Sequence, residues 1–106
     1  MSDWVNVIAD SALADGEHIM VDVDGVAAAI FRIDGSIYAI EDVCTHDGAE
    51  IASGLREGSE IICPRHGARF CLKTGKVIRG PAYESLPCLQ TQVENGIIQV
   101  RDDRWD

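Results

Sequence analysis

The chain has 106 residues, of which 46% are hydrophobic and 25% are charged, a composition that suits one globular domain of ordinary size. Its formal net charge of −9 argues against nucleic acid and anionic membranes as partners, because like charges repel. No apolar run is long enough to cross a bilayer, so we expect no membrane association.

The N-terminal stretch MSDWVNVIAD contains no basic region and no long apolar run, which predicts that the chain has no signal peptide. We therefore expect a cytoplasmic protein, and thiols stay reduced in the cytoplasm. The four cysteines are then expected to be metal ligands or free thiols rather than a disulfide framework.

The charge is distributed unevenly along the chain. Residues 1–55 contain eleven acidic residues and one basic residue, Arg32, whereas six of the nine basic residues lie between Arg56 and Arg79. An acidic surface attracts a basic partner protein and steers its approach. Acidity also keeps a small protein in solution, so charge alone leaves both interpretations open.

The first predicted elements are strands joined by tight turns, after a short turn predicted within DSALADGEH. Strand-like runs occupy residues 17–24, 26–33 and 36–42, with the sequences EHIMVDVD, VAAAIFRI and SIYAIED. The dipeptides Asp24-Gly25 and Asp34-Gly35 lie at their junctions, and Asn95-Gly96 interrupts LQTQVENGIIQV near the end. These dipeptides between strand-like runs are the strongest short-range signal of a β-hairpin. The pattern predicts an antiparallel β protein, either a small sandwich or a barrel.

Residues 40–87 do not follow this pattern and are rich in Gly, Cys, His and Pro. The segment CTHDGAEIASG contains Cys44 and His46, and CPRHGARF contains Cys63 and His66. One cysteine near one histidine would usually be accidental, but two such pairs on two loops predict a four-ligand metal site.

The arrangement of these residues bears on which metal they bind. Structural zinc sites of the Cys₂His₂ type usually place two cysteines together and two histidines together. Here each pair contains one cysteine and one histidine, which favours a binuclear cluster in which one metal takes both thiolates and the other takes both imidazoles. A structural zinc-binding interaction module remains the alternative from another functional class.

At these residues the sequence resembles the Rieske [2Fe–2S] family, in which two histidines replace two cysteines on one iron. The segment FCLKTGKVIRGPA, residues 70–82, also resembles the third hairpin and the proline loop of that family. The resemblance implies that Cys44 and Cys63 bind the inner iron. It implies that His46 and His66 bind the outer iron near the protein surface.

The resemblance covers essentially the whole chain and implies an all-β fold, an antiparallel β sandwich or barrel with an inserted cluster-binding subdomain. We expect residues 1–106 to form a single Rieske ferredoxin domain. Its base would comprise residues of about 1–40 and 86–106, and its cluster-binding subdomain residues of about 41–85.

The function that the resemblance implies is that of a Rieske ferredoxin, a one-electron carrier and not an enzyme. Such a carrier passes electrons from a flavin-dependent ferredoxin reductase to a terminal oxygenase in bacterial aromatic-ring dioxygenase systems, and we expect a monomer. His18 is the only further histidine, too few for the mononuclear iron site of an oxygenase itself. The small subunit of a nitrite reductase is the alternative within the family, although such subunits often lack the cluster ligands.

Differences from high-potential relatives suggest a low reduction potential. Those relatives have a serine where Ala68 stands here, and a disulfide between the positions of Ala49 and Arg65. Fewer hydrogen bonds to the cluster stabilise the reduced state less, so we expect a value at the low end of the range of roughly −150 to +300 mV. Arg65 and Arg69 act in the opposite direction, and we expect solvent to screen them at an exposed tip.

Three further residues receive structural expectations only. Cys71 and Cys88 are predicted to be buried thiols, because a cysteine in a reducing compartment packs like a small hydrophobic residue. His18 lies in a strand-like run and is predicted to be a surface or structural side chain.

Overall fold

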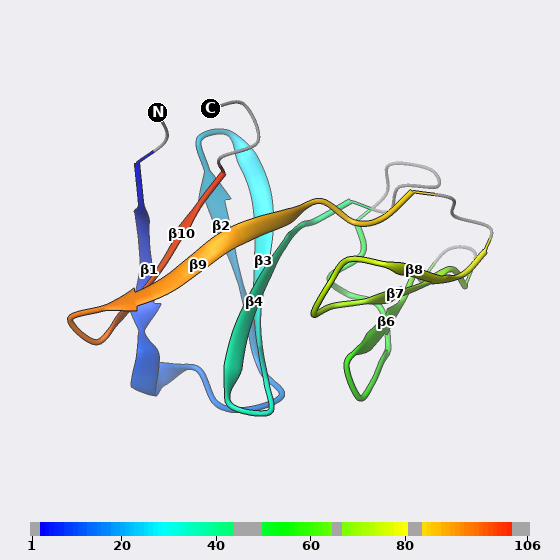
Figure 1. The fold of residues 1–106 in the computed structure, drawn as a ribbon, viewed down its shortest axis with the longest axis horizontal. Helices are drawn as coiled ribbons and strands as arrows, with labels where there is room; N and C mark the ends of the chain where they lie inside the picture. The colour runs from blue at the N-terminus through cyan, green and yellow to red at the C-terminus, as the bar shows by residue number, and fades with distance from the viewer. Residues whose placement is uncertain (1–2, 44–49, 65–66, 81–83, 103–106) are drawn as a thin grey trace.

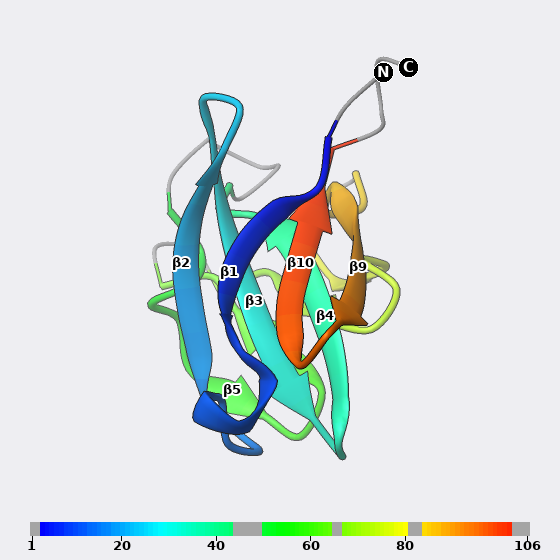
Figure 2. The ribbon, with the colours of Figure 1, turned by 90° about the vertical axis from the view of Figure 1, so that its left-hand side faces the viewer.

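A computed structural model describes residues 3–43, 50–64, 67–80 and 84–102, which form two antiparallel sheets and no α-helix. The larger sheet has six strands in the order β1-β10-β9-β4-β3-β2. They are β1 (Val5–Ala9), β2 (His18–Val23), β3 (Val26–Ile33), β4 (Ser36–Glu41), β9 (Cys88–Glu94) and β10 (Ile97–Arg101). This sheet curls into a nearly closed barrel (Figure 2), and the all-β prediction is confirmed.

The turns between these strands have the geometry that their sequences predict. Asp24 and Gly25 both have positive φ angles, of 53° and 88°, and the Asp34-Gly35 and Asn95-Gly96 turns follow the same pattern. Two central residues with positive φ are the requirement of a type I′ turn, which matches the twist of a two-stranded hairpin. The three predicted hairpins are therefore confirmed as β2–β3, β3–β4 and β9–β10. A 3₁₀ helix, η1 (Asp10–Ala12), lies within the segment that was predicted to form a short turn.

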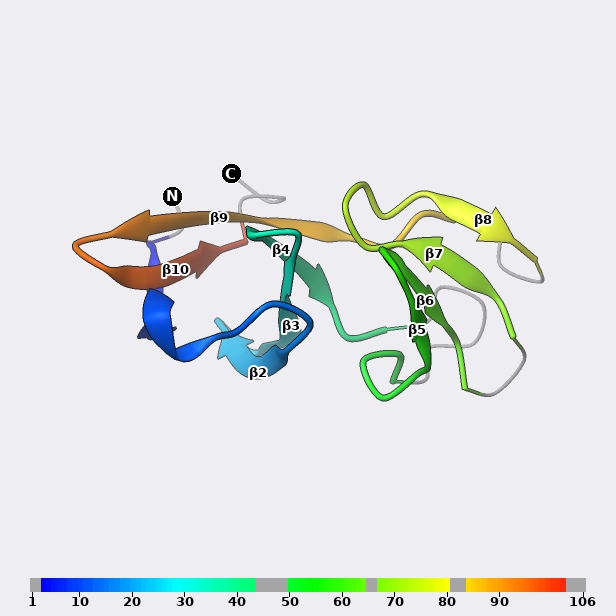
Figure 3. The ribbon, with the colours of Figure 1, turned by 90° about the horizontal axis from the view of Figure 1, so that it is seen from below.

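The smaller sheet is formed by the segment that interrupts the hairpin pattern. Its four short strands lie in the order β5-β6-β7-β8. They are β5 (Arg56–Glu57), β6 (Glu60–Ile62), β7 (Arg69–Cys71) and β8 (Val77–Arg79). The chain leaves the larger sheet after β4 and returns to it through β9, so the smaller sheet lies to one side of the barrel (Figures 1 and 3).

Two hydrophobic cores both take side chains from β3. Ala28 and Ile30 belong to the core inside the barrel. Ala29 and Phe31, which point to the opposite face because side chains alternate along a strand, belong to the core between the barrel and the smaller sheet. All four side chains have 0% exposure. β3 is therefore buried on both faces, and it joins the two sheets through packing.

The core between the sheets contains side chains from both of them. Phe31 contributes from the barrel, and Ile61 and Phe70 contribute from the smaller sheet, all with 0% exposure. Burying each of these large side chains is worth about 1.5–3 kcal/mol. Among the described residues we find no helix that is long and apolar enough to span a membrane.

Candidate metal centre

Cys63 is the one predicted ligand that the structure describes, and it lies directly after β6. Cys44, His46 and His66 fall outside the described residues. Within the described ranges, no three residues of the types His, Cys, Asp or Glu gather as a metal site would require. The prediction of a four-ligand site therefore rests on the sequence, and the structure shows the surroundings in which Cys63 and the flanking segments lie.

The backbone around Cys63 closes a short loop. The Cys63 N–H donates to the carbonyl oxygen of Ala68 over 2.7 Å, and the Gly67 N–H donates back to the carbonyl oxygen of Cys63 over 3.1 Å. Gly67 has a φ of 77°, a left-handed conformation that favours glycine. These bonds hold Cys63 at the base of the loop, while Pro64 is exposed above it.

The thiol of Cys63 is free and the residue is 1% exposed. A buried thiolate is costly unless a metal or another positive charge compensates it. A thiol that lies at the base of a closed loop, next to a glycine that leaves room for a large group, fits a thiolate ligand of an iron–sulfur cluster.

Asp42 anchors the segment that follows the other predicted loop. Its Oδ1 accepts hydrogen bonds from the N–H groups of Ile51 and Ala52, over 2.9 and 2.8 Å. Its own N–H donates to the carbonyl oxygen of Ala27 over 2.9 Å. Asp42 therefore ties the segment that begins at Ile51 to the start of β3. Asp42 belongs to no motif in the sequence, although an aspartate just before a loop is a frequent acceptor of backbone N–H groups.

Gly54 joins the segment after the first loop to the strand before the second loop. A Cβ atom built on Gly54 would lie 2.0 Å from the carbonyl oxygen of Ile62, and Ile62 precedes Cys63. The Ile62 N–H also donates to the carbonyl oxygen of Leu55 over 2.8 Å. The segment that follows the first predicted ligand loop is therefore in direct contact with the strand that precedes the second loop. Only glycine fits at position 54.

The side chain next to the Cys63 loop offers no hydrogen bond. Ala68 is fully buried, and its methyl group packs in the core between the sheets together with Cys63. Ala68 has no side-chain hydrogen-bond donor, and its methyl group belongs to a hydrophobic cluster.

Arg69 differs from the expectation of an exposed, solvent-screened cation. Its side chain is only 24% exposed and pairs with Glu57 over 3.2 Å and with Glu60 over 3.4 Å. The hydrogen bond to Glu57 is the main cause that raises the pKa of the Arg69 guanidinium, so the group stays charged. Two carboxylates, rather than solvent alone, oppose its positive charge. The expectation that solvent screens Arg69 was wrong, because β5 and β6 place Glu57 and Glu60 beside its side chain.

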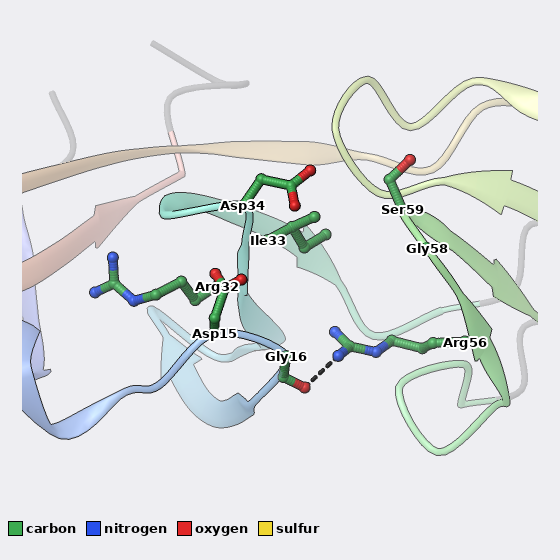
Figure 4. Close-up of a pocket in the computed structure, with 8 residues that line it drawn as sticks. All are labelled: Asp15, Gly16, Arg32, Ile33, Asp34, Arg56, Gly58 and Ser59. Carbon is green, nitrogen blue, oxygen red and sulfur yellow. Dashed lines mark hydrogen bonds between the residues drawn. The ribbon is translucent and has the colours of Figure 1, made fainter.

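A second arginine, Arg56, crosses the seam between the two sheets. Its Nη2 donates to the carbonyl oxygen of Gly16 in the barrel, as Figure 4 shows. Its guanidinium carbon lies 5.2 Å from the ring centroid of Phe31, while His18 stacks on the same ring at 5.1 Å. Within the described part of the chain, Arg56 Nη1 is buried without a hydrogen-bond partner, and the ring of Phe31 offers the guanidinium a cation–π contact. His18 is exposed, in agreement with the expectation of a surface or structural side chain.

A pocket of about 190 Å³ lies along this seam (Figure 4). Its described lining is Asp15, Gly16, Arg32, Ile33, Asp34, Arg56, Gly58 and Ser59. That lining contains no cysteine or histidine, so this pocket is not the metal centre.

The two remaining cysteines do not match their predicted burial. Cys71 is half-buried and Cys88 is exposed, and both thiols are free. Cys71 ends a strand of the narrow smaller sheet, and Cys88 is the first residue of β9, where it pairs with Ile40 of β4. Cys71 leads into the turn between β7 and β8, and Cys88 lies where the chain re-enters the larger sheet, so both positions are near the edges of the packed sheets.

The barrel, the inserted small sheet and the buried Cys63 after β6 together define a small all-β protein with an inserted subdomain. Residues 3–90 match the family model described as the Rieske [2Fe–2S] domain. The chain belongs to the Rieske [2Fe–2S] family, and the cofactor expected from the sequence, one Rieske-type [2Fe–2S] cluster, is confirmed.

Relatives of known function are similar over most of the chain. The ferredoxin component of the naphthalene 1,2-dioxygenase system of Pseudomonas putida is 35% identical over 92 residues, which cover 87% of this chain and 88% of that one. The ferredoxin subunit of the 3-phenylpropionate/cinnamic acid dioxygenase of Escherichia coli (strain K12) is 40% identical over 87 residues, 81% of each chain.

Solved structures agree with these relatives. The ferredoxin of carbazole 1,9a-dioxygenase from Nocardioides aromaticivorans IC177 superposes with a TM-score of 0.86, at 31% identity, over 94% of this chain and 98% of that one. A ferredoxin in complex with the oxygenase of carbazole 1,9a-dioxygenase gives a TM-score of 0.85, at 32% identity, over 92% of both chains. The resemblance to Rieske ferredoxins is therefore confirmed.

Proposed function

We propose that this protein is the ferredoxin component of an aromatic-ring dioxygenase system and carries electrons one at a time. The observation that carries this conclusion is the match, over four fifths or more of each chain, to relatives that are ferredoxin components of such systems. Those relatives are electron-transfer components rather than the catalytic oxygenases, so the protein is a carrier and not an enzyme.

The proposed ligands are Cys44, His46, Cys63 and His66. The thiolates of Cys44 and Cys63 would hold one iron, and the imidazoles of His46 and His66 would hold the other. The bound cluster supplies reversible one-electron chemistry, and the protein binds it and sets its surroundings. The burial of Cys63 and the contact between Gly54 and Ile62 support this assignment.

We also propose that residues of about 41–85 act as the cluster-binding subdomain, with a base of about 1–40 and 86–106. The four strands of the smaller sheet lie between Arg56 and Arg79. Every strand of the barrel lies outside residues 42–87. The division follows the change of sheet, and the core around Phe31 holds the two parts together as one domain.

The proposed partners are a flavin-dependent ferredoxin reductase, which gives the electron, and a terminal oxygenase, which takes it. A similar ferredoxin is found in complex with its oxygenase, which supports the second partner. We propose that the protein works as a monomer in the cytoplasm, as the sequence predicts. The substrate of the oxygenase never contacts the carrier, so the chain carries no information about that substrate.

Purified protein tests the proposal directly. Iron and acid-labile sulfide should each be present at about two per chain, the composition of one [2Fe–2S] cluster, with visible absorption and a red-brown colour. His46→Ala and His66→Ala should each lose or strongly perturb that absorption. A colourless protein with one zinc and no sulfide would establish the zinc-module alternative instead. A coloured protein that a reductase cannot reduce, and that cannot reduce an oxygenase, would retain the cluster but refute the carrier role.

A further inference from the structure

Two cysteines outside the proposed ligand set lie around one turn of the smaller sheet. Cys71 begins this turn, where the N–H of Gly75 donates to the carbonyl oxygen of Cys71 over 2.7 Å. The carbonyl oxygen of Gly75 in turn accepts from the N–H of Leu86 over 2.7 Å. Cys88 follows two residues later, so the backbone hydrogen bonds bring the two cysteines to the same turn.

The sulfur of Cys88 packs against Gly75. A Cβ atom built on Gly75 would lie 2.8 Å from Cys88 Sγ, which means that the missing side chain leaves the space that this sulfur occupies. Although Cys88 is exposed as a residue, desolvation of its sulfur beside Gly75 is the main cause that raises the pKa of Cys88, and the negative charge of Cys71 raises it further. Gly75, against which Cys88 Sγ packs, is also hydrogen-bonded to Cys71, so the two cysteines are neighbours of the same residue.

The turn stabilises a thiolate at Cys71 and not at Cys88. Burial would raise the pKa of Cys71, but hydrogen bonds from the Thr74 side chain and from the backbone of Thr74 and Lys73 outweigh it, together with the charge of Lys73. The pKa of Cys71 is therefore lowered. A partly exposed cysteine with a lowered pKa beside a cysteine with a raised pKa is the arrangement of an attacking cysteine and a resolving cysteine.

We propose that Cys71 and Cys88 form a peroxide-sensitive dithiol that closes into an intrachain disulfide. The Cys71 thiolate attacks one oxygen of hydrogen peroxide, so that an S–O bond forms, the O–O bond breaks and hydroxide leaves. The Cys88 thiol then loses its proton and attacks the sulfenic sulfur, so that the S–S bond forms and water leaves. Two electrons pass from the two thiols to the peroxide, and a dithiol reductant reverses the change.

The disulfide would connect the two sheets covalently. Cys71 ends β7 of the smaller sheet, while Cys88 begins β9 of the barrel and pairs with Ile40 of β4. Oxidation would therefore restrict movement of the smaller sheet relative to the barrel. We expect the oxidised protein to unfold at a higher temperature than the reduced protein, because the disulfide constrains the unfolded chain.

Peptide mapping of the cluster-loaded protein tests the proposal. The protein is treated with one to ten equivalents of hydrogen peroxide, blocked with N-ethylmaleimide and digested with trypsin without reductant. The expected product joins residues 70–73 to residues 80–101, because trypsin cleaves after Arg69, Lys73, Arg79 and Arg101. Dithiothreitol should separate the two peptides.

Single variants separate the two roles. Cys88→Ser should stop at a sulfenic acid at Cys71 that dimedone traps, and Cys71→Ser should leave Cys88 unoxidised. Thr74→Ala is the matched control for the turn: it should move the pH midpoint of Cys71 alkylation by iodoacetamide upward, towards that of an ordinary thiol. The visible absorption of the Cys71→Ser/Cys88→Ser double variant, recorded in parallel, measures how far peroxide damages the cluster itself.

Three results would overturn the proposal. Both thiols could remain free at peroxide levels that bleach the cluster of the double variant. The disulfide could form with Cys44 or Cys63 instead, which would place those residues outside a stable cluster. Cys71 could be oxidised to the sulfinic acid while Cys88 stays a free thiol, which would show that the two sulfurs cannot meet. None of these results depends on whether the protein delivers electrons to an oxygenase.

Discussion

Replacing Gly54 with alanine should destabilise the protein and impair loading of its cluster. The new Cβ atom would lie 2.0 Å from the carbonyl oxygen of Ile62, 3.0 Å from its carbonyl carbon and 3.1 Å from the carbonyl oxygen of Ile51. Real Cβ atoms essentially never approach another heavy atom within 3.0 Å, so the carbonyl oxygen of Ile62 would have to move by about 1 Å or more. These neighbours are backbone atoms, which cannot rotate away as a flexible side chain would.

The magnitude follows from two opposing effects. Overpacking in a folded interior costs about 1–3 kcal/mol, and a clash with hydrogen-bonded backbone belongs at the upper end of that range. The lower conformational entropy of alanine in the unfolded chain offsets about 0.4–1 kcal/mol. The clash therefore wins, with a net loss of about 2 kcal/mol. For a domain of this size, that loss lowers the unfolding temperature by about 8–16 °C.

Thermal unfolding of the cluster-loaded protein under anaerobic conditions measures this effect, and iron and sulfide analysis measures cluster content. Gly80→Ala is the matched control, because among the described residues no atom beyond its chain neighbours lies within 4 Å of a Cβ at Gly80, and its φ is not in the left-handed region. The control should change stability by less than about 1 kcal/mol. If Gly54→Ala unfolded at the same temperature as Gly80→Ala and kept its full iron content, the argument that the two loops depend on this contact would be wrong.

Three other substitutions or conditions probe the site and its partners. Asp42→Ala should lower cluster content, because it leaves the N–H groups of Ile51 and Ala52 without their acceptor at a cost of about 1–3 kcal/mol. Asp42→Asn keeps an oxygen acceptor and should load more iron than the alanine variant. Ala68→Ser should raise the reduction potential measured by protein-film voltammetry, since it adds a donor beside the Cys63 loop; an unchanged or lower potential would contradict the stated cause of a low value. The rate of electron transfer to a basic partner should fall as salt increases, because screening weakens attraction to a protein of net charge −9, and a flat stopped-flow salt profile would exclude steering.

The barrel could be predicted from the sequence because its hairpins are encoded locally. Asp24-Gly25, Asp34-Gly35 and Asn95-Gly96 each specify a turn that only a few residue types can form, and each appears where predicted. The smaller sheet has strands of only two or three residues, which are too short to show an alternating pattern. Its existence could be expected only from the resemblance around residues 70–82.

The supporting residues of the site could not be predicted for a different reason. Gly54 is required because Ile62 approaches it from another strand, and nothing in the neighbouring sequence records that approach. Arg69 pairs with Glu57 and Glu60 through strand pairing, so its surroundings also depend on tertiary structure. Cys88 was expected to be buried from its residue type alone, and the exposed start of β9 overrides that tendency.

The burial of β3 on both faces has a consequence for how substitutions should be tolerated. A strand with one solvent face, such as β2, can accept polar residues at every second position, since His18, Met20 and Asp22 are exposed there. β3 offers no such alternation between Ala28 and Phe31, where four successive side chains have 0% exposure. A saturation-mutagenesis scan should therefore show a two-residue periodicity along β2 and an unbroken block of intolerant positions along the centre of β3, and homologues should diverge more slowly there than along any neighbouring strand.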